Sequence, residues 1–135
     1  MEWFCHVQPP LSLKELALQC RLPKLPRQCA SVHNIAEISA DNQSASVECV
    51  WGVFDVSLTP ICNGFRYALT NCPNALQWSV TTCNGVTLIH CSINQEETDP
   101  AFSESIREFV ENFRKGLEQQ QNNQLEPPSA DVLIQ

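Results

Sequence analysis

The tripeptide Cys-Asn-Gly, which occurs at residues 62–64 and again at residues 83–85, restricts this chain to a small group of folds. Asn-Gly is the strongest short signal for a β-hairpin, because a type I′ turn needs a positive φ at both central residues and these two residues tolerate it best. Each copy therefore predicts two antiparallel strands joined by a tight turn. The middle of the chain is expected to form an antiparallel sheet.

The residues around the second copy alternate in a way that supports this interpretation. When the turn is centred on Asn84 and Gly85, apolar residues face apolar residues at every second position, so that one face of the hairpin belongs to a core. The expected pairs are Cys83–Val86, Thr82–Thr87, Val80–Ile89, Trp78–Cys91 and Leu76–Ile93, with Ser79–His90 and Gln77–Ser92 on the opposite face.

The first copy supports the same scheme when its turn is centred on Asn63 and Gly64. The expected pairs are Leu58–Leu69, Pro60–Tyr67 and Cys62–Phe65, with Ser57–Thr70 and Ile61–Arg66 on the opposite face. Each cysteine then precedes its own turn and faces an apolar residue, and nothing brings the two sulfur atoms together. We interpret the repeat as two hairpin turns and not as half of a metal site, a redox pair or an internal duplication.

Two further segments extend the sheet upstream. Residues 45–51 have apolar side chains at odd positions, whereas residues 54–58 have them at even positions. This change of phase near Gly52 predicts a bulge or a bend, because glycine inside a strand often marks one. A strand at residues 35–39, paired with residues 45–51, completes a predicted meander of four to six strands.

Helices are predicted at both ends of the chain. Ser12 and Glu15 form a capping box, in which each side chain satisfies a backbone N–H group of the other, and the helix is short because Pro23 and Pro26 follow. The C-terminal helix begins after Asp99 and carries a single apolar stripe. The residues of this stripe are Phe102, Ile106, Phe109, Val110, Phe113 and Leu117. They are expected to cover one face of the sheet.

Length and charge narrow the functional classes. The chain has 135 residues, which allows one domain, predicted at residues 1–118 and followed by a polar tail at residues 119–135 that we expect to be disordered. With 8 Lys and Arg against 15 Asp and Glu, the net charge is −7, which argues against binding to nucleic acids or anionic membranes. The four glycines form neither a Gly-x-Gly-x-x-Gly nor a Walker A motif, so no cofactor is predicted.

The chain contains eight cysteines. In a small secreted protein this even number would suggest disulfide bonds, but the N-terminus has no apolar signal segment and a chain of this size folds without cross-links. Cys49 and Cys91 stand where a small apolar residue would also fit, as free cysteine often does. We therefore expect reduced thiols and a cytoplasmic location.

No metal site is predicted, although the N-terminal region holds the residues that come nearest to one. Cys20, Cys29 and His33 are the candidate ligands, with Cys5 and His6 further upstream. The spacing from Cys29 to His33 is that of half a zinc site. The spacing from Cys20 to Cys29 is too loose for the other half, and adjacent residues such as Cys5 and His6 are too close for ordinary tetrahedral coordination.

No catalytic set is predicted either, and one pair of residues comes nearest. Cys72 stands in the segment Thr-Asn-Cys-Pro-Asn, which is expected to be a loop between the hairpins, and His90 lies on the polar face of the second hairpin. A nucleophilic cysteine needs a neighbouring base, and His90 could supply it. The other interpretation is a cysteine at the end of a strand and a surface histidine opposite Ser79.

Together these observations predict an α+β fold, in which a short N-terminal helix precedes an antiparallel meander and a long amphipathic C-terminal helix packs on one sheet face. The other face is only half polar, and such a face often becomes a dimer interface or a partner groove.

The leading hypothesis is a non-catalytic binding or adaptor domain that acts through this face or as a homodimer. The alternative is a small thiol-dependent enzyme or ligand-binding protein that uses Cys72, Pro73 and Asn74 with His90. A protein similar to the small acidic secretion chaperones, which share its length, acidity and helix-and-sheet build, is a further alternative.

Overall fold

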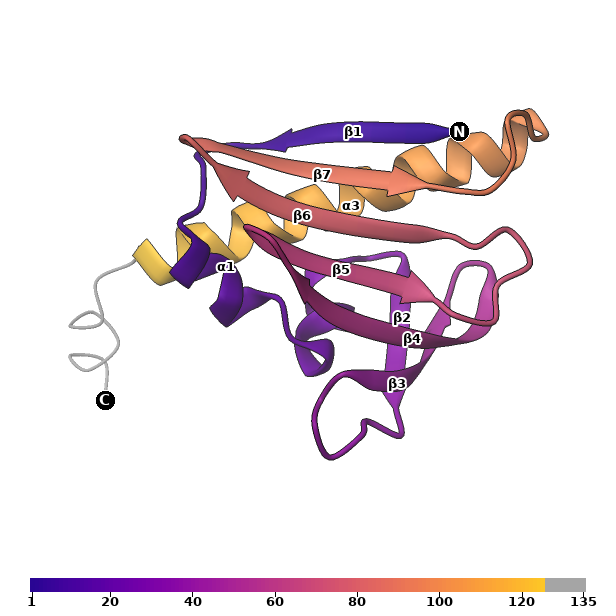
Figure 1. Ribbon diagram of the computed structural model, residues 1–135, viewed down its shortest axis with the longest axis horizontal. Helices are drawn as coiled ribbons and strands as arrows, with labels where there is room; N and C mark the ends of the chain where they lie inside the picture. Colours follow the sequence, from indigo (N-terminus) through magenta and orange to yellow (C-terminus); the bar gives the residue numbers. More distant parts are fainter. Residues whose placement is uncertain (126–135) are drawn as a thin grey trace.

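The computed structural model describes residues 1–125. Seven strands form one antiparallel sheet in the order β1-β7-β6-β5-β4-β3-β2, which confirms the α+β class (Figure 1). The strands are β1 (Glu2–Val7), β2 (Val32–Ala36), β3 (Ser44–Cys49), β4 (Gly52–Ile61), β5 (Gly64–Leu69), β6 (Gln77–Cys83) and β7 (Val86–Ser92). The helical segments are α1 (Leu13–Gln19), η1 (Leu22–Lys24), α2 (Leu25–Gln28) and α3 (Pro100–Leu125).

The sheet has more strands than the predicted four to six. The strand without a counterpart in the sequence prediction is β1, which pairs with β7 in an unbroken register from Glu2–Ser92 to Val7–Thr87. Its partner lies at the other end of the sheet-forming region, so no turn signal in the sequence marks this pairing. β2 also begins earlier than the predicted strand at residues 35–39.

The second Cys-Asn-Gly hairpin has the predicted register. β6 and β7 pair from Cys83–Val86 outward, as the alternation of apolar residues indicates. Asn84 and Gly85 have positive φ angles of 52° and 77°, which a type I′ turn requires. This prediction is confirmed.

The register predicted for the first hairpin is wrong by two residues. Its turn consists of Cys62 and Asn63, and Gly64 belongs to β5, where it pairs with Thr81 of β6. A Cβ atom on Gly64 would overlap the Val80 carbonyl group, so β6 can lie this close only to a glycine. Because a shift of two residues leaves each side chain on its own face, the predicted inner and outer faces are retained.

The change of phase near Gly52 marks a hairpin turn and not the predicted bulge or bend. β3 and β4 are consecutive antiparallel strands in which Cys49 pairs with Gly52, and residues 50–51 form the turn between them. Gly52 has a φ of 125°, a conformation that residues with a side chain rarely adopt. One interrupted strand in the prediction is therefore two paired strands in the structure.

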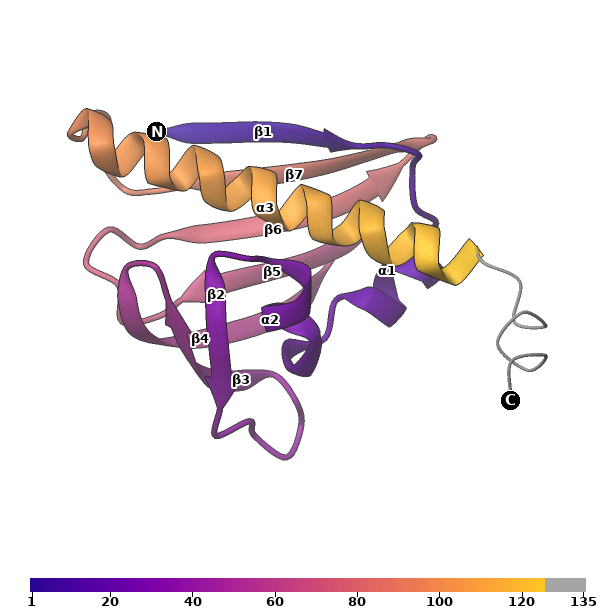
Figure 2. The ribbon, with the colours of Figure 1, turned by 180° about the vertical axis from the view of Figure 1, so that it is seen from behind.

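Both terminal helices begin as their capping signals predict. Ser12 and Glu15 make the two hydrogen bonds of a capping box at α1, and the Phe102 backbone N–H donates to Asp99 Oδ1 at 2.9 Å at the start of α3. Figure 2 shows α3 running diagonally across the sheet. α3 includes the first residues of the predicted tail, and residues 126–135 of that tail lie outside the described residues. No helix in the described part of the chain is long and apolar enough to cross a membrane.

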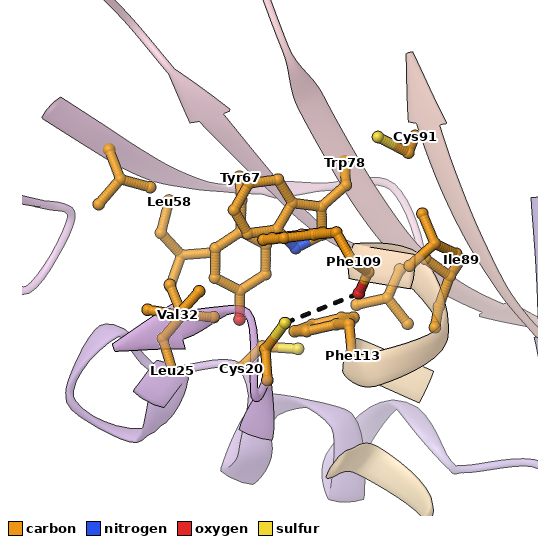
Figure 3. Close-up of a cluster of buried hydrophobic side chains, with 14 of the residues drawn as sticks. Cys20, Leu25, Val32, Leu58, Tyr67, Trp78, Ile89, Cys91, Phe109 and Phe113 are labelled. Atoms are coloured by element: carbon orange, nitrogen blue, oxygen red, sulfur yellow. Dashed lines mark hydrogen bonds between the residues drawn. The ribbon is translucent and has the colours of Figure 1, made fainter. Parts of the chain in front are cut away.

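Aromatic side chains fill the space between α3 and the sheet (Figure 3). Tyr67 and Trp78 stack with their ring centroids 4.9 Å apart. Phe109 meets Trp78 at 4.8 Å, and Phe113 meets Tyr67 at 5.7 Å, both in edge-on arrangements. Each ring is buried and contributes about 1.5–3 kcal/mol to stability. The predicted packing of the C-terminal helix on one sheet face is confirmed.

Candidate functional site

The core beneath α1 and α2 contains a buried polar cluster, which consists of Gln19, Gln28, Tyr67 and Trp78. Within the described residues, five of their polar atoms have no hydrogen-bond partner: Gln19 Nε2 and Oε1, Gln28 Oε1, Tyr67 Oη and Trp78 Nε1. None of the four residues is more than 2% exposed. Buried polar groups are normally hydrogen-bonded, and each unpartnered group costs about 1–3 kcal/mol. The cluster is therefore an energetically unfavourable part of an otherwise apolar core.

Several contacts bring these residues together. Gln28 Nε2 donates a hydrogen bond to the backbone oxygen of Gln19. The Tyr67 hydroxyl group lies close to the thiols of Cys20 and Cys29, the residues that follow the two glutamines. In Figure 3 this hydroxyl group points from the sheet toward the segment that carries Cys20. The cluster thus extends from the ends of two short helices to the middle of the sheet.

The local sequence explains why two glutamines and two cysteines meet the core here. Residues 16–20 and residues 25–29 share the pattern Leu-x-x-Gln-Cys, and in each of them a helix ends at the glutamine. The cysteine that follows is the C-cap, and its backbone N–H donates to the carbonyl group of the leucine. α3 packs closely against this region, and the absence of a side chain at Gly116 permits it, since a Cβ atom there would overlap the backbone of Gln28. This repeat is the sequence signal from which the cluster could have been predicted.

Burial keeps the cluster and its surroundings uncharged near neutral pH. It raises the pKa of the Cys20 thiol and the pKa of the Cys29 thiol to about 12. Burial also raises the pKa of the Tyr67 hydroxyl group well above its usual range, and the neighbouring Cys20 adds to this effect. Groups that keep their protons can exchange hydrogen bonds with a ligand but do not serve as nucleophiles or general bases. The arrangement is therefore suited to binding.

A hollow of about 280 Å³ opens at the surface beside the cluster. Its wall consists of Cys20, Arg21, Pro23, Asn42 and Leu58. Cys20 lies both in this wall and next to the Tyr67 hydroxyl group, so the hollow ends close to the buried polar cluster. Arg21 is the one charged residue of the wall, and the remaining wall residues are apolar or neutral.

The candidate catalytic residues Cys72 and His90 point to opposite faces of the sheet. Cys72 packs against the core, close to Cys49. His90 lies on the outer face, where its Nε2 is 2.8 Å from Glu2 Oε1 and its ring stacks on Phe4 with the centroids 4.7 Å apart. The structure does not bring this cysteine and this histidine together.

The candidate metal ligands are separated as well. Cys20 and Cys29 are buried near Tyr67, whereas His33 is exposed on β2. Cys5 packs against the core, and His6, the next residue of β1, is exposed on the other side of the strand. Within residues 1–125, no group of three or more His, Cys, Asp or Glu side chains is placed to hold a metal ion. All eight cysteines are free.

The outer face of the sheet is largely polar. Cross-strand neighbours form a row across its centre, which consists of Phe4, His90, Ser79, Arg66 and Thr59. A shallow hollow of about 220 Å³ lies over this row. The apolar residues of this face include Val53 and Ile61, which are 65% and 37% exposed. The outer face is therefore more polar than the half-polar face that the sequence predicts.

Comparison with known proteins supports the fold. No protein-family model matches the chain, and no curated protein matches it in sequence. A START superfamily protein from Mycobacterium smegmatis has a similar structure, with a TM-score of 0.59 and 13% sequence identity over 89% of this chain and 94% of that chain.

Two other solved structures are similar over the same share of this chain. The protein XoxI from Bacillus cereus has a TM-score of 0.61 and 10% identity over 89% of this chain and 93% of its own. Ara h 8.0201 has a TM-score of 0.51 and 10% identity over 89% of this chain and 95% of its own. At these identities the similarity shows the fold alone.

Proposed function

We propose that this protein is a non-catalytic binding protein that holds a small molecule at the buried polar cluster, with the hollow beside Cys20 as its entrance. The observation that carries this proposal is the set of five buried polar atoms without partners. A ligand that forms hydrogen bonds with these atoms recovers the cost of about 1–3 kcal/mol that each of them imposes on the free protein. The protein is therefore expected to be more stable with a ligand at the cluster than without one.

The fold supports this proposal by analogy. Domains of the START/Bet v1 superfamily, which the fold resembles, are ligand-binding domains. In this chain aromatic rings fill the layer between α3 and the sheet, and the polar atoms without partners belong to Tyr67 and Trp78 in that layer and to the glutamines at the ends of α1 and α2. Because fold alone does not define function, the buried polar cluster and its hollow are the features that support a binding role.

The cluster also indicates the chemical class of the ligand. A hollow of about 280 Å³ is slightly smaller than ordinary small-molecule pockets of about 300–1,000 Å³, so the ligand should be small. The cluster offers the N–H group of Trp78 as a donor and the amide oxygen of Gln28 as an acceptor, and it carries no charge that would pair with an ion. We expect an uncharged, mainly apolar molecule with one hydroxyl or amide group.

The test uses 1-naphthol as the probe and naphthalene as a matched probe without the hydroxyl group. The indole N–H groups of the three tryptophans give separate NMR signals. Trp78 Nε1 has no partner, whereas Trp51 Nε1 donates to Ser105 Oγ at 2.9 Å. Binding of 1-naphthol at the cluster should shift the Trp78 signal and leave the Trp51 signal in place.

The variant Tyr67→Phe removes one polar atom of the cluster and keeps the aromatic ring. We expect wild-type protein to bind 1-naphthol about fivefold more tightly than naphthalene, since one net hydrogen bond contributes about 1 kcal/mol. This preference should decrease in Tyr67→Phe. Native mass spectrometry first verifies that the protein retains no small molecule that would block the probes. In such a protein, a Trp78 signal that responds to neither probe would contradict the proposal.

A second candidate function is the protein-binding role predicted from the sequence, in which the chain associates with itself or with a protein partner. The Phe4 side chain favours this role, because it is 61% exposed on the outer face. The free thiols fit the cytoplasmic location expected for such a protein. Sedimentation of the purified chain over a range of concentrations tests self-association.

A further inference from the structure

Among the described strands, β1 is an edge strand without the usual protection. It has one neighbour, β7, so one of its two rows of backbone N–H and C=O groups faces away from the sheet. Natural proteins usually protect such an edge with a bulge, a proline or a charged side chain that opposes pairing. The other edge strand, β2, has a bulge between Val32 and Asn34. β1 contains six residues in unbroken register, with no proline, and its one residue with a formal charge, Glu2, lies at the first position of the strand.

A groove of about 420 Å³ runs along this open edge. Residues 2–5 of β1 form one wall, and Arg107, Val110 and Glu111 of α3 form the other. Side chains of consecutive strand residues point to opposite faces, so four of them line one groove only where the groove follows the backbone of the strand. The groove is therefore placed to receive another strand beside β1.

The side chains of β1 next to the groove are incompletely covered. Trp3 and Cys5 point toward the core and are only partly buried. Phe4 points to the outer face and is 61% exposed. A strand added at this edge would cover all three side chains and satisfy the free backbone groups, as in recognition by strand addition.

We propose that the strand received by this groove is β1 of a second copy of the chain. The two strands run antiparallel, and the two sheets join into one continuous sheet. A two-fold axis perpendicular to the sheet then passes beside Phe4, as expected for a closed homodimer. Glu2 of one copy lies opposite His6 of the other, Trp3 lies opposite Cys5, and the two Phe4 rings meet at the axis.

Hydrogen-bond complementarity favours this occupant and this register. The carboxylate of Glu2 faces the imidazole of His6 at both ends of the junction, and an imidazole N–H group can donate a hydrogen bond to a directly opposed carboxylate. Glu2 Oε1 is 2.8 Å from His90 Nε2, which leaves the second oxygen atom of Glu2 for His6. A shift by two residues loses the Glu2–His6 pairs, and a shift by one residue places side chains of the inner face opposite side chains of the outer face.

Cross-linking at the two-fold axis tests the arrangement. In a background that carries Cys62→Ser and Cys83→Ser, which removes the two exposed thiols, Phe4→Cys should form a disulfide-linked dimer on mild oxidation, because opposed Cβ atoms are about 4.5–5.5 Å apart. Val53→Cys is the matched control, since Val53 is as exposed as Phe4 on a different strand of the same face. Cross-linking of Phe4→Cys that is no faster than that of Val53→Cys would overturn the proposal.

A paired substitution gives an independent test in the full chain. We expect wild-type protein to sediment as a dimer at about 100 µM, and Glu2→Lys to raise the dissociation constant at least tenfold, which corresponds to about 1.4 kcal/mol. The double variant Glu2→Lys with His6→Glu should restore the dimer, because it places a lysine opposite a glutamate at both ends of the junction. A monomeric wild type, or a double variant no more dimeric than Glu2→Lys, would overturn the proposal. Far-UV circular dichroism verifies that each variant is folded.

Discussion

Buried cysteines account for several features of this chain that its composition leaves ambiguous. Cys49 and Cys91 are buried as small apolar residues, as their sequence positions predict. Cys20 and Cys29, which with His33 come nearest to a metal site in the sequence, are buried too, beside a tyrosine. The same residue type therefore fills apolar space in one strand and lies beside polar groups at a helix end, and only the neighbours distinguish the two environments.

Stability should fall as the solution becomes alkaline. Burial raises the pKa of Cys20, Cys29 and Cys91 to about 12, from an ordinary value of 9. Between these two values the unfolded chain releases protons that the folded chain retains, so the contribution of these thiols to stability is complete below pH 9 and is lost as the pH rises toward 12. The expected loss is up to about 1.4 kcal/mol per pH unit for each thiol.

Urea unfolding at pH 8, 9.5 and 11 measures this effect. The variant Cys91→Ala removes one buried thiol at little change in volume, so its stability should depend less steeply on pH than that of the wild type. Equal slopes for the two proteins, or a wild-type stability that does not change from pH 8 to pH 11, would show that the buried thiols are not the cause.

The two Cys-Asn-Gly hairpins have the same local signal and different structures. At the second hairpin, Asn84 and Gly85 form the turn, and no neighbouring strand crowds Gly85. At the first hairpin, the close approach of β6 to Gly64 places this glycine inside β5. Pairing with a third strand thus determines which residues turn, and a sequence read one hairpin at a time does not contain that information.

Alanine at the two glycines should distinguish these roles. We expect Gly64→Ala to lower the free energy of unfolding by about 1–3 kcal/mol or more, because the new methyl group overlaps the Val80 carbonyl group and β5 and β6 must separate. Gly85→Ala meets no atom within 4 Å and should cost about 1 kcal/mol, from its positive φ alone. Urea denaturation gives both values, and a larger cost for Gly85→Ala would contradict this assignment.

The molecule as a whole is a sheet with one covered face and one open face. α3 and the two short helices cover the inner face of the sheet, and the rings of Tyr67 and Trp78 link the centre of the sheet to α3. The edges differ, since β1 is regular and β2 is interrupted by a bulge. Resistance to local opening should therefore be highest in the central strands and lowest at the β2 edge.

Native-state hydrogen exchange measures this gradient. Amides of β5 and β6, which have a strand on each side and α3 above them, should exchange only through global unfolding. Amides of β2 should exchange at a lower free energy, because this strand has one neighbour and an irregular register. Equal protection of β2 and β6 would mean that the sheet opens as one unit and that the edge is not a weak point.

The sequence alone was sufficient for the features that depend on near neighbours in the chain. The capping box at Ser12, the apolar stripe of α3 and the turn at Asn84 and Gly85 follow from residue types a few positions apart, whose conformational preferences act before any tertiary contact forms. The inner and outer faces of the hairpins also follow, because strand alternation is local.

Contacts between distant segments determined the rest. β1 is a strand because β7 offers it a regular edge, and Gly64 lies in β5 because β6 approaches it. The buried polar cluster exists because two short helices end with buried glutamines and place the cysteines that follow beside Tyr67, and a burial cost of this kind depends on what surrounds an atom and not on its sequence neighbours. For this chain, local preferences account for most of its elements, and long-range packing accounts for the completed sheet and for the candidate site.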